Sequence, residues 1–549
     1  MSLLRRFWAW VWNLGASRDR VLDPAPAAKS YLRVIALAHI PELTMPKIGT
    51  VASGALQTDN LSTRETWRNY VGTQVAQPFE ICRAESLDDL KNTVKRAAAM
   101  NCPVRAVGSG HSWSDAALTD GIVVETHQLD SVLELYPVTL KSPGDASSLI
   151  HVEAGITIQS LNAILDARGQ ALLNMGGFDG QTLAGVISTS THGSGIGLGS
   201  FPSFVAALVV LAADGSVLQI EPTNGISDPG HFAEVYGTQR VLRQDDQLFN
   251  ATIVAVGSAG IIYAAILRVT QKYWLSELRV LMPWSEIREK LDSGIVDEFR
   301  HVEVLINPYK IKGDNLCLLT TREMVPEPTG PVIPRPFRYV FGNFLSGLPG
   351  SSEVLTFLFN QFPRSTPDFL QSALQDLEDR NPYEDISYRI FNVGYANSLR
   401  AISAEFGIDF DLQIQAVEAI LCSAEEFAAE GGYNSSPIAL RWVAPSPGMV
   451  SMQPTPTCMI EMPMLADVFG SDAMLWRYEN LLTRRFGARP HWGQQNFVSC
   501  SGDLLRKLYL QFDEWVSVVK TLDPGGVFSS RFTDRIGLTN HAPERVRRQ

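Results

Sequence analysis

Residues 104–114 read VRAVGSGHSWS, and this string says more about the fold than any other part of the chain. Val104 and Val107 frame a short strand, and the two glycines that follow predict a tight turn. A second glycine-rich string, TSTHGSGIG, lies at 189–197. Backbone N–H groups in such turns converge on one anion, as a diphosphate requires. Neither string has the G-x-G-x-x-G spacing of a dinucleotide-binding turn or the lysine of a P-loop, so each alone is better explained as a turn in a β-rich domain.

Helices and strands alternate on both sides of the first string. Ser86, followed by Asp89 three residues later, predicts the start of a helix by the capping-box rule, and Pro103 follows its end. The other predicted elements are strands at 104–107 and 150–153, a helix at 157–168, apolar strand-like runs at 204–211 and 253–269, helices around 352–379 and 411–430, a strand near 438–443, and a helix then a turn within 504–532. This alternation is typical of an α/β or α+β protein.

The composition predicts a folded protein of several domains. The chain has 549 residues, of which 45% are hydrophobic and 19% are charged, which is too apolar for a disordered chain and too charged for a bundle of membrane helices. At ~150 residues per domain, this length favours two to four domains. The formal net charge of −12 gives no general attraction to a phosphate backbone, so we expect no nucleic-acid partner.

The six cysteines are scattered along the chain, without a C-x-x-C pair and without a histidine close by. This pattern argues against a zinc site and against a redox dithiol, so we expect no bound metal. A reducing compartment, the cytoplasm, is the simpler interpretation of a long chain with this cysteine usage.

The first 13 residues, MSLLRRFWAWVWN, carry two arginines followed by three tryptophans at alternate positions. The apolar run is far shorter than the ~18 residues that span a membrane. Tryptophans beside arginines suit a helix on a membrane surface, and a tail packed on its own domain or on a partner subunit explains them equally well. Residues 1–60 are therefore treated as an N-terminal extension, with peripheral membrane contact as one of two open interpretations.

Taken together, the two glycine-rich strings resemble the FAD-contacting segments of the vanillyl-alcohol-oxidase-type (PCMH-type) flavoproteins, most closely the sugar-1,4-lactone and alditol oxidases, or aldonolactone oxidoreductases. Further similar segments follow in family order at 180–195, 257–262, 301–303, 491–493 and 522–528. The resemblance implies an α+β fold with an FAD-binding domain at 61–275, a substrate (cap) domain at 276–495 built on a large antiparallel sheet covered by helices, and a return to the FAD domain at 496–549.

The resemblance also implies a set of cofactor contacts. The expected FAD-binding residues are Ala106, Val107, Gly108, Ser109, Gly110, His111, Ser112, Thr182, Ile187, Ser190, Ser194, Gly195, Ile196, Gly197, Ile261 and Ile262. In this family the histidine of the first string carries a covalent bond to the flavin, which makes His111 the expected attachment residue. Chemically, a neutral imidazole is a suitable nucleophile for the flavin 8α-methyl carbon. The serines at 109, 190 and 194 are expected to donate hydrogen bonds to the cofactor, and His192 to brace its own loop by bonding to backbone.

On the substrate side the chain departs from the family pattern. Relatives carry a Glu-x-Arg pair and a His-Trp-Gly-Lys motif, whereas this chain has Ala439-Leu440-Arg441 and His491-Trp492-Gly493-Gln494. Losing a carboxylate and an ammonium together leaves no unpaired buried charge, and it predicts a less polar pocket.

The expected catalytic residues are Arg441, His491, Gln494 and Glu405. Arg441 is expected to bond a substrate oxygen or to stabilise negative charge near flavin N1, with an ordinary salt bridge on a strand as the alternative. His491 is expected to take the hydroxyl proton. Glu405 is expected to hold Arg441, with a surface helix position as the alternative.

The resemblance implies an FAD-dependent oxidase that transfers hydride from a CH–OH group of a sugar lactone, polyol or related alcohol to flavin N5, with reoxidation by O2 giving H2O2. Its partners would then be a small-molecule alcohol and O2. One alternative is the oxidation of a bulkier apolar alcohol such as a sterol, or a dehydrogenase with another acceptor. The second alternative is a flavin-fold protein that has lost catalysis and acts as a binding module, against which the intact His111 motif argues.

Overall fold

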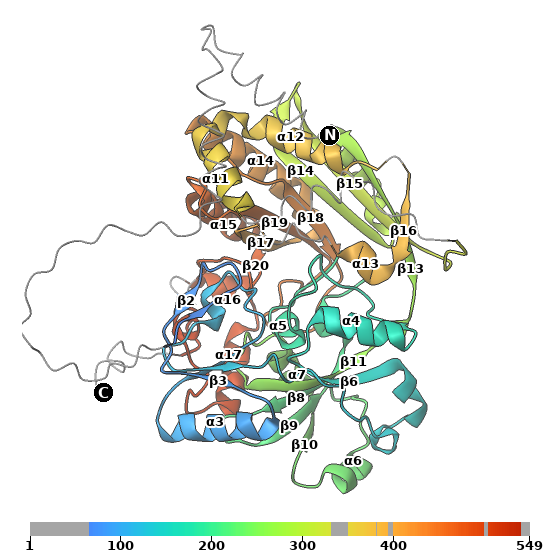
Figure 1. Cartoon of the computed structure of the whole chain (residues 1–549), viewed down its shortest axis with the longest axis vertical. Helices are drawn as coiled ribbons and strands as arrows, with labels where there is room; N and C mark the ends of the chain where they lie inside the picture. The colour runs from blue at the N-terminus through green and yellow to red at the C-terminus, as the bar shows by residue number, and fades with distance from the viewer. Residues whose placement is uncertain (1–64, 331–349, 380, 393–398, 499–502, 540–549) are drawn as a thin grey trace, which may run out of the picture.

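The computed structural model describes residues 65–330, 350–379, 381–392, 399–498 and 503–539, and these form two domains, one above the other in Figure 1. The N-terminal extension and the membrane contact predicted for it lie outside the described residues. No helix in the described part of the chain has the length and apolar character needed to cross a membrane.

The first domain contains two main sheets. Their strands are β3 (Glu80–Arg83), β4 (Val104–Val107), β5 (Ile122–Glu125), β6 (Leu149–Glu153), β8 (Val205–Leu211), β9 (Val217–Glu221), β10 (Val241–Gln244) and β11 (Ile261–Arg268). Strands β3-β5-β4 form a parallel sheet, and β10-β9-β8-β11-β6 form a second, mixed sheet. The predicted helix before β4 is present as α3 (Leu87–Ala99), and the Ser86 side chain accepts the Asp89 N–H at its start.

The apolar, strand-like run at 253–269 is a strand only in its second part. Ile253 ends helix α7 (Asp246–Ile253), which Asp245 caps by accepting the Leu248 N–H. The backbone then turns through positive φ at Val256 and Gly257, and β11 begins only at Ile261. A short apolar run does not distinguish a buried strand from a buried helix end, and here the cap decides.

The second domain is built on one antiparallel sheet of eight strands. These are β13 (Trp274–Pro283), β14 (His301–Ile311), β15 (Asp314–Val325), β16 (Tyr383–Ile386), β17 (Ala401–Asp409), β18 (Ile438–Val443), β19 (Thr457–Leu465) and β20 (Arg489–Pro490). Their order in the sheet is β16-β13-β15-β14-β18-β19-β17-β20. Two-sheet and one-sheet domains with helices packed on their faces make an α+β protein, so the predicted fold class is confirmed.

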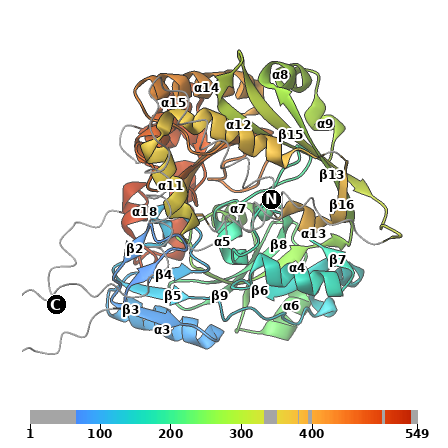
Figure 2. The same cartoon turned by 45° about the horizontal axis from the view of Figure 1, so that its top comes forward.

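Side-chain alternation gives this sheet two different faces. The outer face is covered by helices α8 (Trp284–Asp292), α12 (Thr366–Leu377), α14 (Gln413–Ala429) and α15 (Ser471–Phe486) (Figure 2). Val304, Leu440 and Ile460 are fully buried in the core between these helices and the sheet. Because successive side chains of a strand point to opposite faces, the neighbouring Glu303, Arg441 and Glu461 point to the inner face, toward the first domain.

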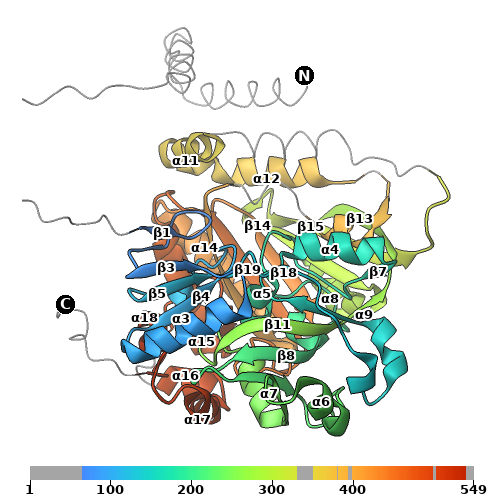
Figure 3. The ribbon, with the colours of Figure 1, turned by 60° about the horizontal axis from the view of Figure 1, so that its bottom comes forward.

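The chain returns to the first domain at its C-terminal end. Helices α16 (Leu504–Leu508) and α17 (Phe512–Leu522) lie beside α7 in Figure 3. The buried Trp515 donates its indole N–H to the Ala251 carbonyl at 3.0 Å. The backbone N–H of Val104 donates to the Val527 carbonyl at 2.7 Å, so this C-terminal segment buttresses the strand that leads into the first glycine-rich string.

Candidate functional site

The first glycine-rich string lies between the start of helix α5 (Leu183–Ser188) and a segment of the second domain. A Cβ at Gly108 would lie 2.0 Å from the Thr182 hydroxyl oxygen, so only glycine allows the first string to approach the start of this helix. From the other domain, the Gly493 carbonyl accepts the Trp113 N–H at 2.8 Å, and the Trp492 carbonyl accepts the Ser114 hydroxyl at 2.6 Å. The first string is therefore fixed to the segment that carries His491 and Gln494.

The His111 ring is held by aromatic ring contacts and not by hydrogen bonds to its nitrogens. It stacks on Tyr70 with ring centroids 4.1 Å apart, and Phe178 lies against it at 4.2 Å. Burial lowers the pKa of His111 to about 4, and within the described chain its ring nitrogens make no hydrogen bond. A neutral imidazole with a free lone pair fits the chemistry of a covalent bond to a flavin carbon.

The segment around His111 also has room for a cofactor. Gly108, Ser109 and Gly110 line a cavity of about 290 Å³. Glu65 and Glu125 lie in its wall as well. Ser112, Ile196, Gly197 and Ile262 keep accessible surface, as residues beside an open site would. These features fit FAD, and residues 108–112 with Thr182 would cradle it.

Two of the expected cofactor donors are used inside the protein instead. The Ser190 hydroxyl lies 3.1 Å from Ser200 Oγ, 3.0 Å from Ser451 Oγ and 2.9 Å from Gln453 Oε1. It has no accessible surface, so the prediction that it donates to the cofactor is wrong. The Ser194 hydroxyl donates to the Val302 carbonyl, which likewise leaves it a structural role.

The remaining expected contacts lie behind the open surface. Ile187 and Ile261 are at most 1% exposed and belong to the hydrophobic core, so their side chains support the site from behind. Val107, Thr182 and Gly195 are buried, and Ala106 is partly buried on β4. The part of the expected set that keeps accessible surface is thus mainly residues 108–112, together with Ile196, Gly197 and Ile262.

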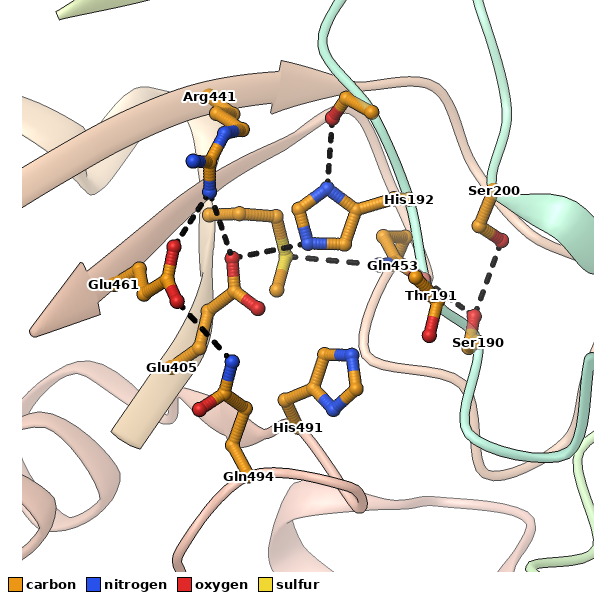
Figure 4. Close-up of polar contacts among 12 residues, drawn as sticks. Ser190, Thr191, His192, Ser200, Glu405, Arg441, Gln453, Glu461, His491 and Gln494 are labelled. Carbon is orange, nitrogen blue, oxygen red and sulfur yellow. Dashed lines mark hydrogen bonds and ion pairs between the residues drawn. The ribbon is translucent and has the colours of Figure 1, made fainter. Parts of the chain in front are cut away.

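A row of alternating charges crosses the inner face of the eight-stranded sheet. The ion pairs follow the strand order as Glu277–Arg322 at 2.7 Å, Arg322–Glu303 at 3.2 Å, Glu303–Arg441 at 3.0 Å, Arg441–Glu461 at 2.7 Å and Arg441–Glu405 at 3.8 Å. Figure 4 shows the end of this row that faces the second glycine-rich string, which carries Ser190 and His192. The site wall is therefore strongly polar.

Arg441 is the centre of this wall. Burial by itself would lower its pKa, but the three carboxylates of Glu303, Glu461 and Glu405 raise it, so the guanidinium stays charged. It keeps 20% of its side-chain surface accessible, which leaves it able to bond a substrate oxygen. Glu405 lies on β17 within the sheet, so the expectation that it holds Arg441 fits the geometry and the alternative of a surface helix does not.

Although residue 439 is an alanine, the wall is polar there, because a carboxylate on the next strand lies beside it. Ala439 pairs directly with Glu461 across β18 and β19. The Gln494 side chain donates to Glu461 Oε1 at 3.2 Å. Glu461 was not identified from the sequence, although an isolated glutamate within the apolar strand TCMIEMPML was a usable signal.

The two histidines of the site are in different bonding states. His491 Nδ1 accepts the Gly493 N–H at 3.0 Å, and burial lowers the pKa of His491 to about 4. Neutral His491 therefore carries its proton on Nε2 and is a donor there. The prediction that His491 takes the hydroxyl proton is corrected accordingly, since its other nitrogen is already bonded.

His192 braces its loop as predicted, because its Nδ1 lies 2.8 Å from the Gly193 carbonyl oxygen. The sequence did not reveal its second contact, in which Nε2 lies 3.0 Å from Glu405 Oε1. The His192 and His491 rings are 6.2 Å apart. The site therefore brings together Arg441, Glu405, His491 and Gln494 as expected and adds Glu461 and His192.

Comparison with known proteins agrees with this geometry. Residues 79–221 match the family model described as FAD binding domain, and residues 265–536 match that described as D-arabinono-1,4-lactone oxidase. The chain is 26% identical over 472 residues to an L-gulono-1,4-lactone dehydrogenase of Mycobacterium tuberculosis, covering 86% of this chain and 98% of that protein. It is 22% identical to the L-gulonolactone oxidase of Mus musculus, with the same two coverages.

Among solved structures, a solvent-stable cholesterol oxidase superposes with a TM-score of 0.67 at 16% sequence identity, covering 86% of this chain and 97% of that one. At this identity the likeness concerns the fold alone. The two structures share a two-domain architecture over most of both chains.

Proposed function

This chain belongs to the family of FAD-dependent aldonolactone oxidoreductases, and from that premise we propose that it oxidises a CH–OH group of a sugar 1,4-lactone with O2 as the electron acceptor. In the overall reaction the alcohol loses two hydrogens to become a carbonyl, and O2 becomes H2O2. The observation that carries the proposal is the accessible Arg441 guanidinium amid three carboxylates, beside the second glycine-rich string at 189–197.

The polarity of the wall favours a sugar lactone over a sterol. Arg441, Gln494 and the Nε2–H of His491 offer hydrogen-bond donors, and Glu461 offers an acceptor. A polyhydroxylated lactone replaces the water on these groups with its own hydroxyl and carbonyl oxygens. An apolar ring system would desolvate them without compensation, which is costly for charged groups.

FAD, when bound, supplies the acceptor for the hydride at its N5 position. The chain's own residues position the substrate and take up its hydroxyl proton. Arg441 and the Nε2–H of His491 bond the oxygen that becomes the carbonyl. We assign acceptance of the hydroxyl proton to Glu461, because its carboxylate keeps 18% of its side-chain surface accessible whereas Glu405 keeps only 4%. A Glu461→Gln variant, isosteric and uncharged, is then expected to lose turnover while binding lactone.

A covalent flavin bond through His111 is part of the proposal. The free lone pair of a neutral ring held between Tyr70 and Phe178 supports it. Acid precipitation of the purified protein tests it, since yellow colour that stays in the pellet is covalently bound and colour in the supernatant is not.

The acceptor is the part of the proposal that needs its own experiment, because one relative is named a dehydrogenase and another an oxidase. Initial rates with L-gulono-1,4-lactone and D-arabinono-1,4-lactone are to be measured as O2 consumption with H2O2 formation, and in parallel under nitrogen with an artificial dye. Lactone-dependent H2O2 formation supports the oxidase. Turnover with dye alone would assign a dehydrogenase, and turnover only with cholesterol would replace the lactone by a sterol.

We place this activity in the cytoplasm. The five cysteines in the described residues are all free thiols, which supports a reducing compartment. Fractionation of cells expressing the full chain tests this location, and recovery in the membrane fraction would favour the peripheral contact predicted for residues 1–13.

A further inference from the structure

One contact joins the two domains through a histidine and a glutamate, and its hydrogen bonds dictate a protonation state. His192 follows α5 in the first domain, and Glu405 lies on β17 in the second. His192 Nδ1 lies 2.8 Å from the Gly193 carbonyl oxygen, which only accepts, so Nδ1 carries a proton. His192 Nε2 lies 3.0 Å from Glu405 Oε1, and an ionised carboxylate also only accepts. The contact therefore requires a second proton on the pair.

We propose that His192 is a doubly protonated imidazolium at neutral pH, ion-paired with the Glu405 carboxylate across the domain boundary, and that it acts as a positioning residue for the substrate wall. The fixed charge holds Glu405 Oε1 on the side of Arg441. It thereby holds the guanidinium beside the second glycine-rich string. The assignment rests on the hydrogen bonds of the protein itself and does not depend on which lactone is the substrate.

The charges on the sheet face agree with this assignment. The row contains the carboxylates Glu277, Glu303, Glu405 and Glu461 and the guanidinium groups Arg279, Arg322 and Arg441. This leaves one negative charge in excess on a buried surface. A positive His192 balances it, which matters because an unpaired buried charge is strongly destabilising.

The groups that face His192 come from three elements: Glu405 on β17, Arg441 on β18 and His491 on the segment after β20. Burial and the Arg441 charge lower the pKa of His192, but Glu405 outweighs them and the net shift is upward. His491 contributes little positive charge, because it is neutral and accepts a backbone N–H. The two rings thus have different roles: His192 is a fixed charge, and His491 is a neutral hydrogen-bond donor.

Two other buried histidines serve as matched comparisons. The Nδ1 atoms of His301 and His151 lie 2.6 Å from the Ser194 carbonyl oxygen and 2.9 Å from the Glu134 carbonyl oxygen, respectively. Their Nε2 atoms are buried and have no partner among the described residues, and burial lowers the pKa to about 3 for His301 and to about 4 for His151. Each repeats the backbone bond of His192 and lacks its carboxylate, so the carboxylate is the difference.

Nitrogen-15 NMR of the flavin-loaded protein, labelled at histidine, tests the proposal without any turnover measurement. At pH 7 the two ring nitrogens of His192 are expected to give the paired shifts of an imidazolium, while His301 gives the separated shifts of a neutral ring. His192→Gln assigns the signal by its loss. Glu405→Gln assigns it independently, because an amide donates to Nε2 and is expected to convert His192 to the neutral form.

A neutral His192 signal at pH 7, or an imidazolium signal that persists in Glu405→Gln, would overturn the proposal. A kinetic split separates a positioning role from a merely structural one. In Glu405→Gln, kcat with the lactone is expected to fall. The covalent flavin content is expected to stay unchanged, because the His111 ring keeps its contacts with Tyr70 and Phe178. Normal NMR states with no lactone turnover in the wild-type protein would contradict the proposed function and leave the proton assignment intact.

Discussion

At the scale of single residues, three histidines have different bonding states because their surroundings differ. His111 touches aromatic faces and has no hydrogen bond among the described residues, so its lone pair is free. His491 accepts a backbone N–H, so it is a donor at Nε2. His192 faces a carboxylate, so it carries a charge. On the proposed account, one residue type thereby supplies a nucleophile, a hydrogen-bond donor and a cation.

Replacing His111 tests the first of these roles. His111→Ala is expected to abolish covalent attachment while FAD still binds, since the glycine-rich turn and Thr182 remain. Acid precipitation followed by absorption of pellet and supernatant measures it. His151→Ala, at another buried histidine, is the matched control and is expected to keep the flavin in the pellet. Flavin attached to denatured His111→Ala would assign the bond to another residue.

Arg441 carries the residue-scale prediction for catalysis. Arg441→Ala removes the guanidinium that bonds substrate oxygen, and we expect kcat/KM to fall by about 10²–10³-fold with flavin content unchanged. Arg441→Lys keeps the charge without the planar fork and is expected to lie between the two. Steady-state kinetics with a sugar lactone measure both. Near-normal kcat/KM in Arg441→Ala would reduce the residue to a salt bridge on the sheet.

At the scale of elements, the register between β18 and β19 explains how the chain departs from its family and keeps a polar site. Ala439 and Glu461 are direct partners, so a carboxylate on either strand occupies nearly the same place above the sheet. Gln494 donates to this carboxylate from the segment after β20. An amide suffices there because Arg441 already supplies the positive charge.

A strand-to-strand exchange tests this compensation. Ala439→Glu is expected to lower the melting temperature, because it puts a second carboxylate opposite Glu461, an effect of about 1 kcal/mol for like charges in such a pair. The double variant Ala439→Glu/Glu461→Ala is expected to recover most of the lost melting temperature and to turn over the lactone. If the single variant is as stable as wild type, or if the double variant melts no higher than the single one, then carboxylates at 439 and 461 do not occupy the same position above the sheet.

The same register shows how far the sequence allowed prediction. The fold class, the glycine-rich turn, His111 and Arg441 follow from local strings whose chemistry is readable along the chain. Glu461 and the contact of His192 with Glu405 do not, because 213 positions separate the latter pair and only the register of the sheet brings such residues together. The prediction that Ser190 and Ser194 donate to the cofactor was wrong for a related reason. The partner of a hydroxyl group depends on which residues pack against it in the folded protein.

At the scale of the whole molecule, the site exists only where the domains meet. The first domain supplies the glycine-rich turn and His192, and the second supplies the charged inner face of its sheet (Figures 1 and 4). Bonds such as Trp113 N–H to the Gly493 carbonyl and His301 Nδ1–H to the Ser194 carbonyl tie the two sides together. Conditions that change charge at this boundary should therefore change the stability of the whole protein.

The pH dependence of stability is expected to peak near pH 6.5. Buried His111, His151 and His491 have pKa values lowered to about 4, so the unfolded chain binds more protons and stability rises with pH up to 6.5. The pKa of His192 is raised above 6.5, so its contribution is complete below that value and is lost as the pH rises through the raised pKa.

Melting temperatures across the pH range measure this profile. Glu405→Gln is expected to remove the fall on the weakly alkaline side and to leave the rise below pH 6.5 in place. A wild-type melting temperature that stays constant or increases from pH 6.5 upward would contradict the charge assigned to the domain boundary.

The most direct test of the central claim is the visible spectrum of the purified protein under nitrogen, recorded before and after a sugar 1,4-lactone is added. We predict an oxidised flavin spectrum that bleaches with L-gulono-1,4-lactone or D-arabinono-1,4-lactone, returns when O2 is admitted, and does not bleach with cholesterol. A flavin that no lactone reduces, or a purified protein without flavin, would contradict the claim that this site oxidises sugar lactones.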